Sequence, residues 1–215
     1  KMIAIVVNRA AVVVKREVFF LRKEAKKAKC AKVLLEALKR NPVSSIQHQV
    51  SSIMEITSMT SLHWEEVRNI YEEGIATGQA TFQQSAPGFD DWNKDHLQHS
   101  RLVAIENGQV AGWAALTAVS GRCVYAGVAE VSVYVSTLYR GKGIGTILLQ
   151  SLITSSEKNN IWTLQAGIFP ENSASIKIHE ANGFRLVGKR ERIGQMSGIW
   201  RDTLLFERRS TLTGL

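Results

Sequence analysis

The chain has 215 residues, of which 45% are hydrophobic and 21% charged, and this composition is typical of one globular domain with an appendage. Its formal net charge of +8 is unevenly placed: residues 1–40 contain 12 Lys and Arg against 3 Asp and Glu, and residues 41–215 contain 15 against 16. This distribution excludes a general polyanion-binding surface on the larger part, and no apolar run reaches the about 18 residues that a membrane span needs.

Residues 1–52 are predicted to form a basic N-terminal extension and linker. The apolar run at residues 2–7 favours a short strand, and the Lys-rich stretch at residues 15–40 favours an amphipathic helix that ends at Asn41-Pro42. Such a helix either lies on a membrane surface or an acidic partner, or is a solvated appendage, and we prefer the appendage. A signal peptide is not indicated, because polar residues interrupt the apolar run and no cleavage site of small residues stands out.

Residues 53–210 are predicted to form one α+β domain. The expected elements, in chain order, are a strand at 54–60, helices at 62–71 and 89–99, a hairpin at 101–105 and 110–117, a strand at 125–135, a helix at 141–157, a strand at 161–167, a helix at 173–182, and strands at 184–193 and 200–207. We expect Ser61 to cap the first helix, Asn107-Gly108 to turn the hairpin and Gly183 to end the last helix. A mixed, largely antiparallel sheet with helices on both faces accommodates this order.

The segment from Glu130 to Gly145, EVSVYVSTLYRGKGIG, organises the rest of this domain. Its first half alternates valines with polar or aromatic residues, which predicts a strand. Its second half, Arg140 to Gly145, is a glycine-rich loop, and the apolar run that follows predicts a helix.

A glycine-rich loop between a strand and a helix is suited to binding an anion. Glycines allow close backbone approach, and free N–H groups at a helix start hold phosphate. The nucleotide-hydrolase loop is rejected because no Lys-Ser/Thr pair follows the last glycine, and the dinucleotide loop because the order is Gly141-x-Gly143-x-Gly145. Taken alone, the loop could instead be a closely packed helix cap, which is the less favoured alternative.

A second motif decides between these interpretations. Asn172 begins the segment NSASIKIHEANGF, which ends at Phe184. The pattern Arg/Gln-x-x-Gly-x-Gly after a strand, followed by Asn-x-x-Ser/Ala-x-x-x-His/Tyr-x-x-x-Gly-Phe, resembles the GNAT acetyltransferase superfamily. This resemblance implies the GNAT fold and an acyltransferase activity.

Three further segments resemble the phosphinothricin-type acetyltransferases within that superfamily. These segments are Ile70-Tyr71 with Ala76 to Phe82, the strand from Arg122 to Val135, and the closing Gly194-Gln-Met-Ser-Gly-Ile-Trp-Arg-Asp202. The resemblance covers about residues 54–207. It implies N-acetylation of the α-amino group of a small amino acid or of a glutamate analogue such as phosphinothricin, methionine sulfoximine or arsinothricin, in a detoxification or resistance role.

The resemblance also implies acetyl-CoA as the cofactor. The loop amides would hold its pyrophosphate, and the strand would pair with its pantetheine arm. The cofactor-binding residues that this implies are Val133, Tyr134, Val135, Arg140, Gly141, Lys142, Gly143, Ile144, Gly145, Thr146, Asn172 and Ser175. Asn172 could instead cap a helix, and both roles are compatible.

Two residues are expected to be catalytic. An α-amino group, with a pKa of about 8, is substantially protonated near neutral pH, so acyl transfer needs a base. Glu130 matches the family's catalytic glutamate, and we expect partial desolvation on its apolar strand to make it a stronger base; the alternative is a structural strand-end glutamate. The developing oxyanion needs donors, and the resemblance implies that backbone N–H groups near Val133 supply them.

His179 occupies the position of the family's suggested acid for the leaving thiolate, and the alternative is a packed histidine.

The resemblance implies a substrate pocket lined by Phe82, Arg122 and Tyr125. Arg122 precedes Glu130 by eight residues, the family spacing of a substrate-binding arginine, and a guanidinium suits both carboxylate and phosphinate. Arg201 and Trp200 could also shape this pocket, although Trp200 could be core.

His96 and His99 share a helical spacing but lack a third ligand, so we expect no metal, and two cysteines are too few for a disulfide framework. We expect a cytoplasmic enzyme that acts on a small-molecule amine, with no nucleic acid or membrane span, and the family suggests a homodimer. The alternative functions are a GNAT enzyme for another amine, such as a protein N-terminus or a polyamine, and a non-enzymatic binder that uses residues 1–40.

Overall fold

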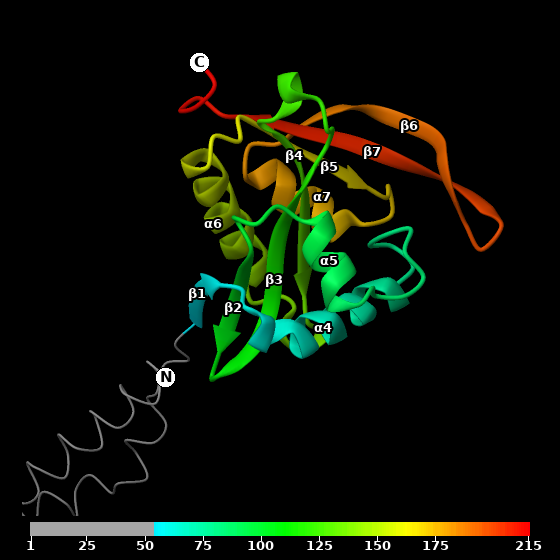
Figure 1. Cartoon of the computed structure of the whole chain (residues 1–215). Helices are drawn as coiled ribbons and strands as arrows, with labels where there is room; N and C mark the ends of the chain where they lie inside the picture. Colours follow the sequence, from blue (N-terminus) through cyan, green and yellow to red (C-terminus); the bar gives the residue numbers. More distant parts are fainter. Residues whose placement is uncertain (1–53) are drawn as a thin grey trace, which may run out of the picture. The chain divides into compact units, whose positions relative to one another are not determined.

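The computed structural model describes residues 54–215. The strand, basic helix and linker predicted for residues 1–52 lie outside the described residues, and the domain boundary near residue 53 stays a prediction. The described elements are β1 (Met54–Ser58), the 3-10 turn η1 (Ser61–His63), α4 (Trp64–Ala76), α5 (Phe89–Asp95), β2 (Leu102–Glu106), β3 (Gln109–Ala118), η2 (Cys123–Tyr125), β4 (Val128–Val135), η3 (Thr137–Tyr139), α6 (Ile144–Lys158), β5 (Thr163–Ile168), α7 (Ser173–Ala181), β6 (Arg185–Met196) and β7 (Ile199–Arg209) (Figure 1).

The strands form one seven-stranded sheet in the order β1-β2-β3-β4-β5-β7-β6. Neighbouring strands are antiparallel except for β4 and β5, which are parallel. The α+β class and the mixed, largely antiparallel sheet are therefore confirmed. The crossover through α6 between β4 and β5 accounts for the one parallel pair, since parallel neighbours need a long connection.

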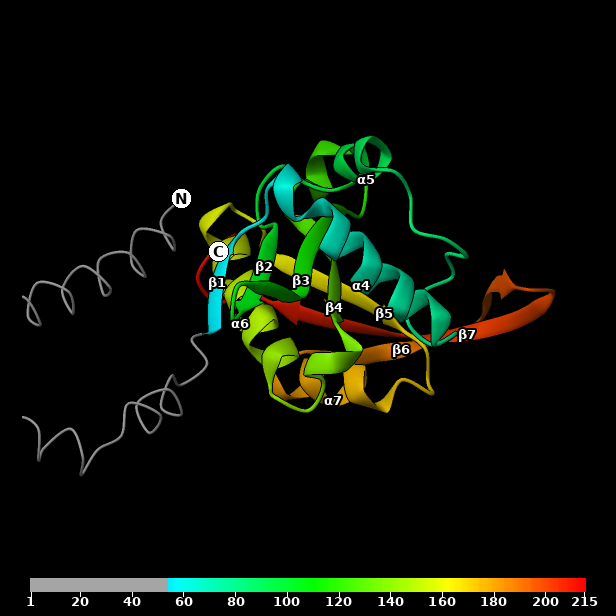
Figure 2. The same ribbon diagram turned by 90° about the horizontal axis from the view of Figure 1, so that it is seen from below.

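Helices cover both faces of this sheet, as predicted. Figure 2 shows α4 and α5 on one face and α6 and α7 on the other. β3 is buried along almost its whole length, because alternate side chains enter the two different layers: Trp113 and Ala115 face α4, and Ala114 and Leu116 face α6. This explains why its sequence is a continuous apolar run rather than an alternation.

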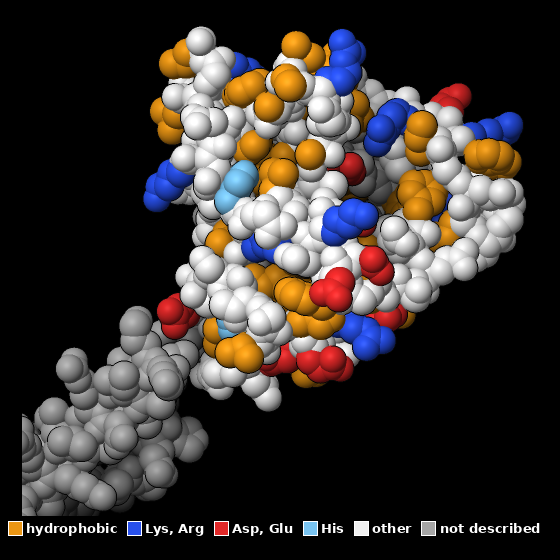
Figure 3. Space-filling view, viewed as in Figure 1, with side chains coloured by type: hydrophobic (Ala, Val, Ile, Leu, Met, Phe, Trp, Pro, Cys, Tyr) orange, Lys and Arg blue, Asp and Glu red, His pale blue; other side chains and the backbone are white. Residues whose placement is uncertain are grey.

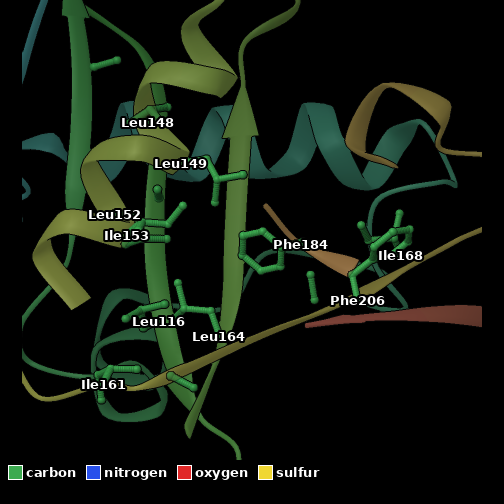
Figure 4. Close-up of a cluster of buried hydrophobic side chains, with 14 of the residues drawn as sticks. Leu116, Leu148, Leu149, Leu152, Ile153, Ile161, Leu164, Ile168, Phe184 and Phe206 are labelled. Atoms are coloured by element: carbon green, nitrogen blue, oxygen red, sulfur yellow. The ribbon is translucent and has the colours of Figure 1, made fainter. Parts of the chain in front are cut away.

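The larger core cluster lies under α6. Leu148, Leu149 and Leu152 are fully buried and pack toward Leu164 of β5 and Phe206 of β7 (Figure 4). Each fully buried side chain of this size contributes about 1.5–3 kcal/mol relative to an exposed one. The cluster holds the helix that follows the glycine-rich loop firmly against the sheet.

Most predicted elements are confirmed, with shifts at their ends that have local causes. The hairpin turn has positive φ at Asn107 and Gly108, and Gly183 has φ 81° just after α7, as expected for left-handed turn and cap residues. The predicted cap Ser61 is wrong, because Thr60 starts a 3-10 turn there and its N–H donates to His63 Nδ1 at 3.1 Å.

Two other boundaries differ because tertiary pairing ends an element. α5 stops at Asp95 rather than His99, since His96 bridges to Thr117 and the Leu97 N–H donates to the Leu116 carbonyl. β4 starts at Val128 rather than Tyr125, because Cys123–Tyr125 forms a 3-10 turn. Within residues 54–215, no helix has the length and apolar character needed to cross a membrane.

Candidate active site

The site begins where two neighbouring strands separate. β4 and β5 are paired only as far as Glu130 opposite Gln165, whereas β4 stays paired with β3 up to Val135 opposite Gly112. Among the described residues, the β5-facing edge of β4 from Val131 to Val135 therefore has no partner strand, and its backbone groups are free to bind a ligand.

A pocket of about 970 Å³ opens along this free edge. It is lined by residues of α4, the segment after α4, β4, the glycine-rich loop, β5, α7 and the β6–β7 hairpin. In the space-filling view the molecule is hollowed between its main body and that hairpin, and acidic and basic side chains are interspersed on the same face (Figure 3).

One end of the pocket is formed by the glycine-rich loop. Gly141 and Gly143 both have φ 78°, and Gly143 is the N-cap of α6, so the turn requires residues that tolerate the left-handed region. The residues of the first turn of α6 line the pocket together with Arg140, and the first N–H groups of a helix have no partner within the helix itself. This arrangement fits a phosphate or pyrophosphate group.

Lys142 departs from the prediction. It does not line the pocket, because its ammonium lies 3.1 Å from Glu106 Oε2 and 4.8 Å from the centre of the Tyr139 ring. The Glu106 side chain is only 9% exposed, and an almost buried carboxylate requires a cation. The other predicted loop residues, Arg140, Gly141, Gly143, Ile144, Gly145 and Thr146, all line the pocket.

The start of α7 faces the same end. Asn172 Oδ1 accepts a hydrogen bond from the Ser175 N–H at 3.1 Å, so the predicted cap is confirmed. Its Nδ2 donates to the Gln79 carbonyl at 3.1 Å, which ties α7 to the segment after α4. Both Asn172 and Ser175 line the pocket, and their contact with a cofactor stays a prediction.

His179 is 4% exposed and lines the pocket from α7. Its Nδ1 lies 2.8 Å from the Ser175 carbonyl, and a carbonyl only accepts, so Nδ1 carries the proton. Burial lowers the pKa of His179, and its Nε2 has no partner among the described residues. A neutral ring with Nδ1 protonated leaves Nε2 as an acceptor, and a proton donor at this position would need the doubly protonated form that burial disfavours.

Glu130 lies where the β4–β5 ladder ends, and its carboxylate lines the pocket. The expected partial desolvation is not observed, because Glu130 is exposed. The cause is the separation of the strands itself, which leaves the pocket open beside this residue. Glu130 can therefore accept a proton from an amine directly or through water.

The wall near Glu130 is aromatic. Phe82 packs edge-on against Phe169 with ring centres 4.8 Å apart, and a Cβ at Gly194 would lie only 2.8 Å from the Phe82 ring. Phe82 lines the pocket, and its role in substrate binding stays a prediction. Arg201 lies behind this wall, over the Phe169 ring at 4.4 Å and paired with Glu171 at 3.1 Å. Its neighbour Trp200 is 58% exposed, so it is not core.

The structure does not bring two predicted substrate residues to the pocket. Arg122 and Tyr125 are both exposed at η2, before β4 begins, and neither lines the pocket. The Arg122 guanidinium instead lies over the Tyr125 ring at 5.6 Å. Their role in substrate binding stays a prediction that the geometry of this chain does not support.

Two tyrosines, Tyr71 and Tyr134, also line the pocket. The rings of Tyr71 and Tyr134 are 4.9 Å apart, and burial raises the pKa of both phenols. Tyr134 also stacks on Trp113 with centres 4.7 Å apart. Both phenols stay protonated near neutral pH and act as neutral hydrogen-bonding groups.

Sequence reasoning missed several lining residues. These are Tyr71, Thr81, Phe169, Arg190 and Thr203. Tyr71 lies in a segment that resembles the phosphinothricin-type acetyltransferases and could have been found from it. Arg190 belongs to no recognised sequence motif, and only the pairing of β6 with β7 shows that it faces the site.

Comparison with known proteins agrees with this geometry. The acetyltransferase (GNAT) family model matches residues 59–184. The chain is 34% identical to Bacillus subtilis YwnH, provisionally named a phosphinothricin acetyltransferase, over 62% of this chain and 85% of that protein. It is 35% identical to the L-methionine sulfoximine/L-methionine sulfone acetyltransferase of Salmonella typhimurium, over 49% of this chain and 62% of that enzyme, which is under two thirds of its length.

A solved structure extends the comparison to the fold. The phosphinothricin acetyltransferase of Sinorhizobium meliloti, in complex with acetyl-CoA, superimposes with a TM-score of 0.67 at 27% identity and covers 75% of this chain and 90% of its own. The free edge of β4 and the glycine-rich loop of this chain suit that acetyl donor. The chain therefore belongs to the GNAT family, in the subgroup of phosphinothricin and methionine sulfoximine acetyltransferases, and is an acetyl-CoA-dependent N-acetyltransferase.

Proposed function

We propose that this enzyme acetylates the α-amino group of a small amino acid or of a glutamate-analogue antimetabolite such as phosphinothricin, methionine sulfoximine or arsinothricin, in a detoxification role. The observation that carries this proposal is the position of Glu130, at the point where the paired part of β4 ends and its free edge begins. The named activities of the relatives support the substrate class.

The donor half of the site is made mainly of backbone. Gly141 to Thr146 would hold the pyrophosphate through the first N–H groups of α6, and Arg140 would add a positive charge. The free edge from Val131 to Val135 would pair with the pantetheine arm as a missing strand does. Acetyl-CoA supplies the acetyl group as a reactive thioester.

Glu130 is proposed as the base. Its carboxylate takes a proton from the substrate ammonium group, which frees the nitrogen lone pair for attack. Backbone N–H groups near Val133 donate to the carbonyl oxygen on which negative charge develops. The neutral amine then gains the acetyl group and loses its second proton, which leaves with the thiol, and Glu130 releases the first proton to solvent.

His179 is proposed to act as a neutral group that accepts a hydrogen bond at Nε2. Its ring is buried with Nδ1 held by the Ser175 carbonyl, and its unprotonated Nε2 is itself buried without a partner among the described residues. This geometry suits a thiol or hydroxyl donor and favours an orienting role over proton donation.

The test is thiol release from acetyl-CoA by the full chain across a panel of amines. The panel contains phosphinothricin, methionine sulfoximine, arsinothricin, ordinary amino acids, a polyamine and a peptide with a free N-terminus. We expect turnover of the amino acids or glutamate analogues. Turnover of only the polyamine or the peptide would replace this proposal with the other amine class.

A further inference from the structure

Arg190 is a charged pocket residue that the mechanism above leaves without a role. It lies on β6 opposite Thr203 of β7, in the last regular pair before a bulge, and pairing resumes only at Gly194 opposite Arg201. Arg190, Gly194 and Thr203 all line the pocket. The bulge therefore ends the regular hairpin just where these residues meet the site.

The guanidinium is anchored at one nitrogen and open at the others. Arg190 Nε donates to Thr203 Oγ1 at 3.2 Å, and Thr203 is 4% exposed. The neighbouring arginines Arg185, Arg201 and Arg208 are each paired with a carboxylate at 2.9 to 3.1 Å. Within residues 54–215, Arg190 has no such ion pair, so its two terminal nitrogens are available to a ligand.

Gly167 of β5 shows how close this cation lies to the proposed base. A Cβ at Gly167 would be 3.0 Å from Arg190 Nη2 and 3.4 Å from Glu130 Oε1. The two opposite charges thus border the same point without forming an ion pair in the described structure. A gap flanked by one carboxylate and one guanidinium fits a ligand that carries both charges on adjacent groups.

We propose that Arg190 binds the α-carboxylate of the acceptor while Glu130 receives its α-amino group, so that this pair selects α-amino acids over simple amines. This inference rests on the proposed function and names the residue that would give it substrate specificity. An α-amino acid carries its ammonium and carboxylate on one carbon, which matches the close spacing of Glu130 and Arg190.

The position of Arg190 separates it from the anion site of the cofactor. Glu130 lies five residues before Val135 on an extended strand, a distance of about 16 Å, and the glycine-rich loop follows Val135. Arg190 borders Glu130, at the opposite end of the free edge. It is therefore placed for the acceptor rather than for the pyrophosphate.

The test compares methionine sulfone with its α-carboxamide, which keeps the amine and the side chain but lacks the negative charge. We expect Arg190→Gln to lower kcat/KM for the free acid by about 10- to 100-fold, mainly through KM, since a hydrogen-bonded ion pair is lost. The kcat/KM for the carboxamide should change little. For each enzyme, kcat/KM for the free acid is divided by kcat/KM for the carboxamide. Comparing this acid-to-amide ratio between variant and wild type cancels the different basicity of the two amines.

Arg192→Gln is the matched control, because Arg192 is on the same strand but does not line the pocket. Arg190→Lys should be intermediate, since it keeps the charge and loses the planar fork. An unchanged acid-to-amide ratio in Arg190→Gln would overturn the inference while leaving the proposed function standing. A wild-type enzyme that turns over neither compound, nor any other amino acid, would overturn both.

Discussion

The two halves of the pocket are built in different ways. The proposed donor half consists of the free edge of β4, the glycine-rich loop and the first turn of α6, and these lie within one continuous stretch from Val131 to Thr146. The acceptor half is built from side chains of separate segments: Phe82 after α4, Glu130 on β4, Phe169 after β5, and Arg190 on β6.

This difference matters for specificity. A site made of backbone N–H groups depends on φ angles and strand pairing, which many side chains tolerate, so it suits a donor shared by a whole family. A site made of side chains from different elements can change one residue at a time, so it suits acceptors that differ between relatives. The predictions below test whether the two halves can be perturbed separately.

The largest expected effect is at the residue where the halves meet. Glu130→Gln should lower kcat by about two orders of magnitude or more, because the amide cannot take a proton. Steady-state kinetics would measure this, and calorimetry should find acetyl-CoA binding unchanged. A near-wild-type kcat would exclude Glu130 as the base.

A perturbation confined to the acceptor half is available at Gly194. Gly194→Ala places a Cβ 2.8 Å from the Phe82 ring, and overpacking of this kind costs about 1–3 kcal/mol. We expect KM for the amino acid to rise about tenfold, with the dissociation constant of acetyl-CoA unchanged.

Gly188→Ala is its control, because it is on the same strand and a Cβ there meets nothing within 4 Å. If both variants raise the acceptor KM equally, the contact between Gly194 and Phe82 does not shape the pocket.

The converse perturbation is Gly143→Ala in the donor half. Gly143 has φ 78° and a Cβ there meets nothing within 4 Å, so the substitution acts on the backbone alone. The left-handed conformation costs a non-glycine residue about 1 kcal/mol, which should weaken acetyl-CoA binding about fivefold. Gly121→Ala, without positive φ, is the control. A larger change in acceptor KM than in acetyl-CoA affinity would contradict the division into halves.

The smallest expected effect is on stability. Burial lowers the pKa of His179 in the folded state, so the unfolded chain binds more protons there as the pH falls below about 6.5, and acid destabilises the fold. His179→Asn keeps a donor for the Ser175 carbonyl and removes this titration. Between pH 7.5 and pH 5.5, the melting temperature of this variant should fall by a few degrees less than that of wild type. Each kcal/mol of unfolding free energy corresponds to a shift of roughly 2–4 °C.

The lowered pKa values of His96 and His99, which burial also causes, would leave some acid sensitivity in the variant. If the melting temperatures of variant and wild type fall equally between pH 7.5 and pH 5.5, His179 contributes nothing to the acid sensitivity.

The sequence predicted much of the fold because its signals are local. The alternation in β4, the Asn107-Gly108 turn and the cap at Asn172 each depend on neighbouring residues and were confirmed. The errors came where distant groups compete. α5 ends early because His96 and Leu97 pair with β3.

Lys142 shows the same limit within the site. Its place in the glycine-rich loop predicted a phosphate ligand, but its ammonium pairs with Glu106. Arg122 has the family spacing from Glu130 and lies outside the pocket, because a 3-10 turn precedes β4. Spacing along the chain does not determine which way a side chain points when the backbone between two residues turns.

By itself the sequence determined the proposed donor half, because the strand, the glycines and the helix that follows them are consecutive and line the pocket together. Only the tertiary structure decided the acceptor half, because the pairing of β5 with β7 and of β7 with β6 brings Gly167, Thr203 and Arg190 beside Glu130. The physical reason is that backbone conformation follows from local residue type, whereas the meeting of two opposite charges depends on which strands pair and in what register.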